Sequence, residues 1–80
     1  MEEKKSRLEA ALFLAEEPVD TDEISDILNL GSIGFVEELI EEYQEDLEES
    51  HRGLEMIQTE NGDELKVKKD HLEHVSHLAP

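Results

Sequence analysis

The sequence SIGFVEELIEEYQEDLEES, at positions 32–50, decides the fold of this chain. Its apolar residues recur at the spacing of one helix face, as Val36, Leu39, Ile40, Tyr43 and Leu47. Ser32 stands before the first turn, where a hydroxyl accepts a hydrogen bond from a free backbone amide. We therefore expect Ser32 to cap a helix of about 18 residues, roughly 27 Å long, with one buried stripe.

The rest of this helix is almost wholly acidic and contains no Lys or Arg. The carboxylates are Glu37, Glu38, Glu41, Glu42, Glu45, Asp46, Glu48 and Glu49. Pairs such as Glu37 and Glu41 lie one turn apart and repel each other by roughly 0.2–0.5 kcal/mol at low salt. Packing, salt or a partner must offset this repulsion. The acidic surface is open to three explanations: a high-salt adaptation, recruitment of a basic partner, or solvated surface.

Two shorter helices are expected before this stretch. Ser6 and Glu9 fit a capping box, so the first helix should run from Ser6 to about Ala15, and Pro18 should end it. Its buried stripe would consist of Leu8, Ala11, Leu12 and Ala15. The segment around Val19 is expected to be a turn or one rung of a strand.

The second helix should be capped by Asp20 or Thr21, with Ile24, Ile27 and Leu28 on one apolar side. It should end at residues 29–31, with Gly31 in the left-handed conformation.

A β-hairpin is expected after the long helix, because Asn61-Gly62 is a preferred two-residue hairpin loop. With this loop Met56 would pair with Val67, and Gln58 with Leu65. Leu54, Met56, Leu65 and Val67 would then share one face. Asp70 and Glu73 indicate a final capped helical segment that carries Leu72, Val75 and Leu78.

The order helix, extended segment, helix, turn, helix, hairpin is that of a winged helix-turn-helix domain. We therefore predict an α+β, mostly helical fold with three helices, a β-hairpin wing and a C-terminal helical segment. The 80 residues allow a single domain, 1–80. The long acidic helix would occupy the position of a DNA-reading helix.

Composition limits the function. The formal net charge is −16, so the chain should be repelled by nucleic acid and by anionic membranes. No apolar run approaches the roughly 20 residues of a membrane span, and the N-terminus is no signal peptide. We expect a cytoplasmic protein that binds neither nucleic acid directly nor membrane.

The sequence resembles a known family. LEAALFLAEEPVDTDEISDILNL, then the acidic helix, then RGLEMIQTENGDELKVKKDHLEHVSHL, is similar to the N-terminal winged-helix domain of segregation and condensation protein B (ScpB). The resemblance covers essentially the whole chain; Glu17-Pro18 and Arg52-Gly53-Leu54-Glu55 are its more specific parts. Glu64, where the family usually has an aromatic residue, departs from the pattern.

This resemblance implies a non-enzymatic accessory subunit that forms a homodimer. Such a subunit binds the kleisin (ScpA-like) subunit, and through it SMC, in chromosome condensation and segregation. The family normally has a second winged-helix domain, so residues 1–80 would be the N-terminal half of a two-domain member. The alternative function is a winged-helix transcriptional regulator that binds DNA.

No catalytic, cofactor-binding or metal-binding residues are predicted. The glutamates lack an accompanying catalytic motif. His71, His74 and His77 lie three apart, but a zinc site needs three or four converging ligands that are held by further hydrogen bonds. Lys66, Lys68 and Lys69 form a basic cluster on the wing, interpreted as a solvated strand edge or a contact for phosphate or carboxylate groups.

Four apolar residues are not needed by the expected core: Phe13, Leu14, Phe35 and Ile57. Exposed apolar patches mark interaction sites. These four are therefore the candidate partner-binding residues, and the alternative is that the core is arranged slightly differently.

Overall fold

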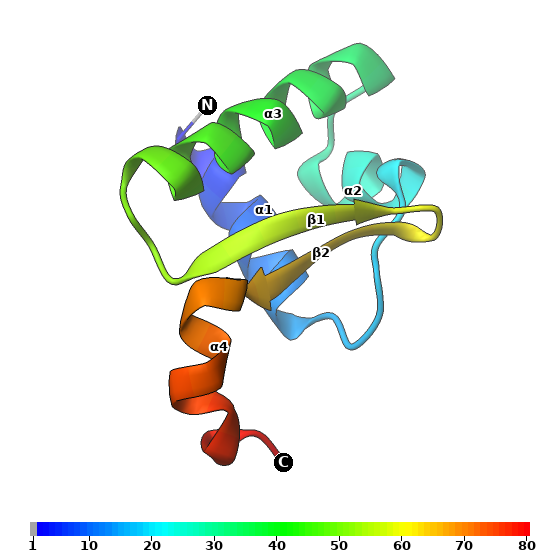
Figure 1. The fold of residues 1–80 in the computed structure, drawn as a ribbon. Coiled ribbons are helices and arrows are strands. Elements are labelled where there is room, and N and C mark those ends of the chain that lie inside the picture. Colours follow the sequence, from blue (N-terminus) through cyan, green and yellow to red (C-terminus); the bar gives the residue numbers. More distant parts are fainter. Residues whose placement is uncertain (1) are drawn as a thin grey trace.

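A computed structural model describes residues 2–80 and shows a winged helix-turn-helix domain (Figure 1). The elements in chain order are α1 (Glu2–Leu14), α2 (Thr21–Leu28), α3 (Ile33–Glu49), β1 (Leu54–Thr59), β2 (Gly62–Val67), α4 (Lys69–Val75) and the short 3₁₀ helix η1 (Ser76–Leu78). The three helices before the hairpin surround one core, and α4 projects away from it. The predicted fold class is confirmed.

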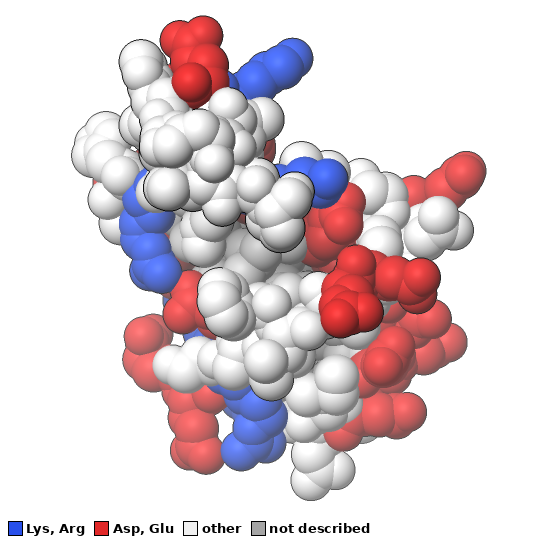
Figure 2. Space-filling view, turned by 90° about the horizontal axis from the view of Figure 1, so that it is seen from below, with Lys and Arg blue, Asp and Glu red and all other residues white. Residues whose placement is uncertain are grey.

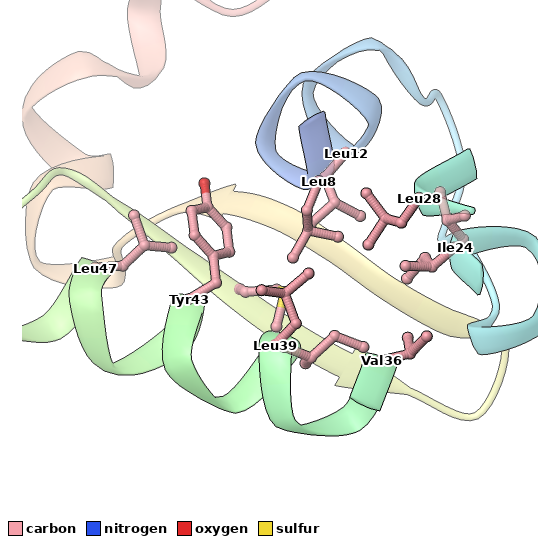
Figure 3. Packing of buried hydrophobic residues seen from close by; sticks show 11 residues of the cluster. Leu8, Leu12, Ile24, Leu28, Val36, Leu39, Tyr43 and Leu47 are labelled. Atoms are coloured by element: carbon pink, nitrogen blue, oxygen red, sulfur yellow. The ribbon is translucent and has the colours of Figure 1, made fainter. Parts of the chain in front are cut away.

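Helix α3 follows the sequence pattern closely. Ser32 is its N-cap, and its side chain accepts a hydrogen bond from the Phe35 backbone amide. All five residues of the predicted stripe are buried. They meet Leu8 and Leu12 of α1 and Ile24 and Leu28 of α2 in a single cluster (Figure 3).

Helix α1 begins earlier than the sequence pattern predicted. It starts at Glu2, so Ser6 lies inside the helix and the predicted capping box is wrong. Charged contacts stabilise this additional turn: Lys5 lies 2.9 Å from Asp46 of α3, and Arg7 lies 3.4 Å from Glu3. The amino group of Lys4 donates a hydrogen bond of 2.6 Å to the Leu28 carbonyl oxygen at the end of α2.

Helix α2 begins as predicted and ends differently. Asp20 is its N-cap and accepts a hydrogen bond from the Glu23 amide at 2.9 Å. The left-handed residue at its end is Asn29, with φ 55°, and not Gly31. Asparagine tolerates this conformation better than most residues, so the turn closes two residues earlier.

The wing forms with a register two residues away from the predicted one. Met56 pairs with Leu65, and Thr59 with Gly62, so the loop is Glu60-Asn61. The predicted pairings of Met56 with Val67 and Gln58 with Leu65 are wrong. A shift by two preserves the side-chain faces, so Leu54, Met56, Leu65 and Val67 still share one face.

The reason for this register is a third strand segment. Val19 and Asp63 form an antiparallel bridge, with backbone hydrogen bonds of 2.8 and 2.9 Å. The neighbouring Gly62 has φ 133° and packs directly on the backbone of Val19. Of the two expectations for the segment around Val19, the strand rung is confirmed. This bridge is compatible with Gly62 as the first residue of β2 and not with Gly62 in the hairpin loop.

Helix α4 and the following η1 are the least buried helical elements of the domain. Its N-cap is Lys68, without a side-chain cap bond, and Asp70 lies in the first turn, so the predicted cap at Asp70 is wrong. Neither α4 nor η1 contains a buried residue. The Lys68 amide, bonded at 2.8 Å to the Gly53 carbonyl, anchors the start of this segment to the domain.

Candidate protein-interaction surfaces

The first candidate surface is the C-terminal end of α1. Leu8 and Leu12 point into the core, and Phe13 and Leu14 lie off that face at the last turn. Their exposed fractions are 75% and 79%, far above those of core residues. At this exposure, neither side chain is covered by another segment among residues 2–80. These two predicted residues form one exposed apolar site.

Phe35 forms a separate site on the first turn of α3. It is 60% exposed and stands two residues after Ile33, which is also exposed. Residues Ser32, Gly34, Phe35 and Glu38 line a shallow hollow there. Figure 1 shows the start of α3 and the end of α1 on different sides of the domain. The structure therefore does not bring Phe35 together with Phe13 and Leu14.

Ile57, the fourth predicted residue, is partly buried. It lies on β1 opposite Glu64, on the face of the hairpin that carries Glu55 and Lys66. It is thus neither a core residue nor a largely exposed one.

The sequence analysis missed a further set of exposed apolar side chains at the C-terminus. These are Val67, Leu72, Val75 and Leu78. The helical segment with Leu72, Val75 and Leu78 was expected, but its lack of a partner within the domain was not. The spacing of these residues could have indicated this exposure. Three apolar residues follow at intervals of three, and the apolar stripes of the other helices are already paired with one another.

The α3 surface does not have the chemistry of a DNA-reading helix. Its exposed side is lined by carboxylates and carries no Lys or Arg. Lys5 of α1 contacts two of these carboxylates, Asp46 at 2.9 Å and Glu42 at 3.5 Å. The hydrogen bond to Asp46 raises the pKa of the Lys5 amino group, because it favours the charged form.

A polar network joins α1, α3 and the following loop. The Tyr43 hydroxyl donates a 2.6 Å hydrogen bond to Glu9, and Arg52 reaches the same Glu9 carboxylate oxygen at 2.8 Å. Burial and the Glu9 carboxylate raise the pKa of the Tyr43 hydroxyl well above its ordinary value. Tyr43 therefore stays a hydrogen-bond donor and fixes the orientation of α1 on α3.

Two of the three wing lysines, Lys66 and Lys68, make polar contacts within the domain. Lys66 lies 3.7 Å from Glu64, and the Lys68 amino group donates to the Leu47 carbonyl oxygen at 3.3 Å near the end of α3. Lys68 thus neutralises part of the negative charge at a helix C-terminus.

Two further properties concern residues 2–80. No helix in this part of the chain is long and apolar enough to cross a membrane. Within the same residues, no group of three or more His, Cys, Asp or Glu side chains is arranged to hold a metal ion.

Known proteins share this fold. The crystal structure of a dimer of an ScpB N-terminal domain complexed with ScpA peptide is similar, with a TM-score of 0.84 and 30% sequence identity over 95% of this chain and 87% of that chain. Comparison with curated proteins finds no match.

Two longer structures resemble the chain in fold. ScpB from Mycobacterium tuberculosis has a TM-score of 0.87 and 21% identity over 96% of this chain. A conserved hypothetical protein from Chlorobium tepidum has a TM-score of 0.80 and 23% identity over 98% of this chain. The chain spans about half of each, 48% and 49%.

The family assignment rests on the sequence as well as on the fold. Residues 6–80 match the family described as segregation and condensation complex subunit ScpB. This range contains every element from α2 to η1 and most of α1. The chain therefore belongs to the ScpB family.

Proposed function

We propose that this chain acts in chromosome condensation and segregation as a non-enzymatic subunit of a prokaryotic SMC–kleisin complex. It would do so by forming a homodimer and by binding a kleisin (ScpA-like) segment. The observation that carries the proposal is the 30% identical ScpB N-terminal domain, which is a dimer complexed with ScpA peptide.

The extent of the similarity supports the same assembly here. The match covers 87% of that dimeric domain, so most of the residues available for its contacts have counterparts in this chain. In longer family members, we propose that residues 1–80 correspond to the first of two winged-helix domains.

The exposed apolar residues supply surfaces suited to protein partners. Phe13, Leu14 and Phe35 carry large apolar side chains, and their exposure to water does not stabilise a monomer. We propose that these residues, with Ile57 on the wing, contribute to partner binding. The acidic α3 supports protein binding over DNA binding, since a DNA-binding helix needs cations to neutralise phosphates.

The test uses the purified chain and tagged ScpA from the same genome. Light scattering coupled to gel filtration should give about twice the monomer mass of 9.2 kDa, and the ScpA should co-purify with the chain. Phe13→Glu, Phe35→Glu and Ile57→Glu should each weaken one of these associations. Ser6→Glu, at an exposed position of α1 about two turns before Phe13, is the matched control and should leave both intact.

Two results would contradict the proposal. One is a monomer that retains no ScpA at any concentration. The other is a gel shift of duplex DNA by micromolar protein at about 0.1 M salt, which would favour a transcriptional regulator.

A further inference from the structure

Strand β1 has one edge that no other strand covers. Val19 and Asp63 bond to each other through the backbone amide and carbonyl of both residues. Asp63 therefore has no backbone group left for Gln58, its partner across the hairpin. Because hydrogen bonding alternates along an antiparallel pair, the backbone groups of Gln58 and Met56 point away from β2. They form a free strand edge.

The free edge of β1 faces α3. Figure 1 shows β1 between α3 and β2. The Gln44 side-chain amide of α3 donates a hydrogen bond of 3.3 Å to the Met56 carbonyl oxygen, so this carbonyl is turned toward the helix. Among residues 2–80, no other hydrogen bond reaches the outward backbone groups of Met56 and Gln58. Unpaired backbone groups along an edge are a template for a further strand.

The cleft between this edge and α3 is acidic. It has a volume of about 260 Å³ and is lined by four carboxylates: Glu41, Glu45 and Glu48 from α3 and Glu55 from β1. None of the four forms an ion pair with a Lys or Arg side chain among residues 2–80. The view from below in Figure 2 shows the same imbalance, with carboxylates gathered toward one side and Lys and Arg side chains standing apart from one another. The cleft therefore favours a cationic occupant.

We propose that an extended segment of a partner protein, with Lys or Arg at alternate positions, adds to the free edge of β1 as a further strand. Backbone hydrogen bonds to Met56 and Gln58 hold this segment. Successive side chains of a strand point to opposite faces, so one alternate set faces the carboxylates of α3. The inference goes beyond the proposed homodimer and kleisin binding and requires neither.

A second copy of this chain does not supply such a segment. The sequence that comes nearest to the pattern is Lys66-Val67-Lys68. Val67 is already paired with Leu54 on the other edge of β1, and the Lys68 amide is bonded to the Gly53 carbonyl at 2.8 Å. Two copies that each carry a net charge of −16 also repel one another. The occupant is therefore a different protein.

The test measures binding of a fluorescent peptide to the full chain by anisotropy. In this seven-residue peptide lysine alternates with threonine, and binding should be saturable in about 0.05 M KCl and weaker in about 0.5 M KCl. A peptide of the same composition with its lysines in one block should bind at least about fivefold more weakly, because it places fewer cations on one face. N-methylation of alternate backbone amides keeps the charge and removes hydrogen-bond donors, and should weaken binding at least about tenfold.

Variants of the chain test the edge and the cleft separately. Gln58→Pro removes an outward amide that β2 does not use, and should raise the peptide dissociation constant at least about fivefold. Gln58→Ala keeps this amide and is the matched control. Glu45→Gln/Glu48→Gln should weaken binding more than Glu37→Gln/Glu38→Gln, which removes the same charge from α3 outside the cleft. Thermal unfolding checks that each variant remains folded.

The outcomes decide between strand addition and other contacts. If the block or N-methylated peptide binds as tightly as the alternating one, the contact depends on charge alone and the inference is overturned. It is overturned equally if Gln58→Pro is folded and binds like Gln58→Ala, or if the wild type binds no peptide. If Gln58→Pro converts a wild-type dimer into a monomer, a second copy occupies the edge, which also overturns the inference.

Discussion

Substituting Gly62 with alanine tests why the wing is placed where it is. Gly62 has φ 133°, a conformation that side-chain-bearing residues rarely adopt. Forcing alanine into it costs about 1–3 kcal/mol. The added Cβ would also lie 2.5 Å from the Val19 carbonyl oxygen and 2.7 Å from the Asp20 amide nitrogen. These are backbone atoms, so they cannot move aside by a change of rotamer.

The clash is relieved only by separating β2 from the segment around Val19. That separation weakens the two bridge hydrogen bonds of 2.8 and 2.9 Å between Val19 and Asp63. Each contributes about 0.5–1.5 kcal/mol to the free energy of unfolding. With the backbone strain, Gly62→Ala should destabilise the domain by about 2–5 kcal/mol. For a domain of this size, the melting temperature should fall by at least about 8 °C.

Thermal unfolding followed by far-UV circular dichroism measures this effect. Gly31→Ala and Gly53→Ala are matched controls, because a Cβ at either position meets nothing within 4 Å and neither residue has a positive φ. Both controls should change the stability by less than about 1 kcal/mol. The explanation is refuted if Gly62→Ala melts within about 2 °C of the wild type, or if a control loses as much.

Salt and pH should act on identifiable carboxylates. Screening of the like charges along α3 should raise the melting temperature between low salt and about 1 M KCl, and a flat or falling curve would show that these charges are already compensated. Asp63 is buried, and burial raises the pKa of its carboxyl group, so the folded state binds this proton more tightly than the unfolded chain. The charged carboxylate therefore destabilises the domain at neutral pH. The melting temperature of Asp63→Asn should exceed that of the wild type at about pH 7, and the difference should shrink toward about pH 4; a constant difference would contradict this.

The sequence was sufficient for elements in which side-chain pattern and burial agree. The α3 stripe and its Ser32 cap were predicted correctly, because both depend on residues within the helix. The side-chain faces of the hairpin were also correct. Its pairing was not, since Asn61-Gly62 is a strong local loop signal and the observed register depends on a contact of Gly62 with Val19, far away in sequence. Local turn preference was overridden by tertiary contact.

The ends of α1 and α2 were also predicted wrongly, because local residue types were overridden by contacts elsewhere in the domain. Ser6 and Gly31 have the residue types that favour helix ends, yet α1 extends past Ser6 and α2 closes at Asn29. Long-range contacts of Lys4 and Lys5 with the ends of other helices stabilise the additional turn of α1, and no local pattern reveals them.

The candidate site was predictable in part. Phe13, Leu14 and Phe35 were recognised because the core stripes did not need them, and all three are exposed. The exposure of Leu72 and Leu78 depends on where α4 points when it leaves the wing. That direction is a property of the assembled domain, so the sequence predicted the last helical segment and its apolar residues without their exposure.

The bridge between Val19 and Asp63 also sets the order in which the domain can be completed. Its two residues are 44 positions apart, so the strand rung beside the first helix has no partner until the whole acidic helix and the first wing strand have been synthesised. Contacts between residues so distant in sequence form slowly, because the loop between them must be closed first. We therefore expect the helices to associate first and the wing to pair with the segment around Val19 last.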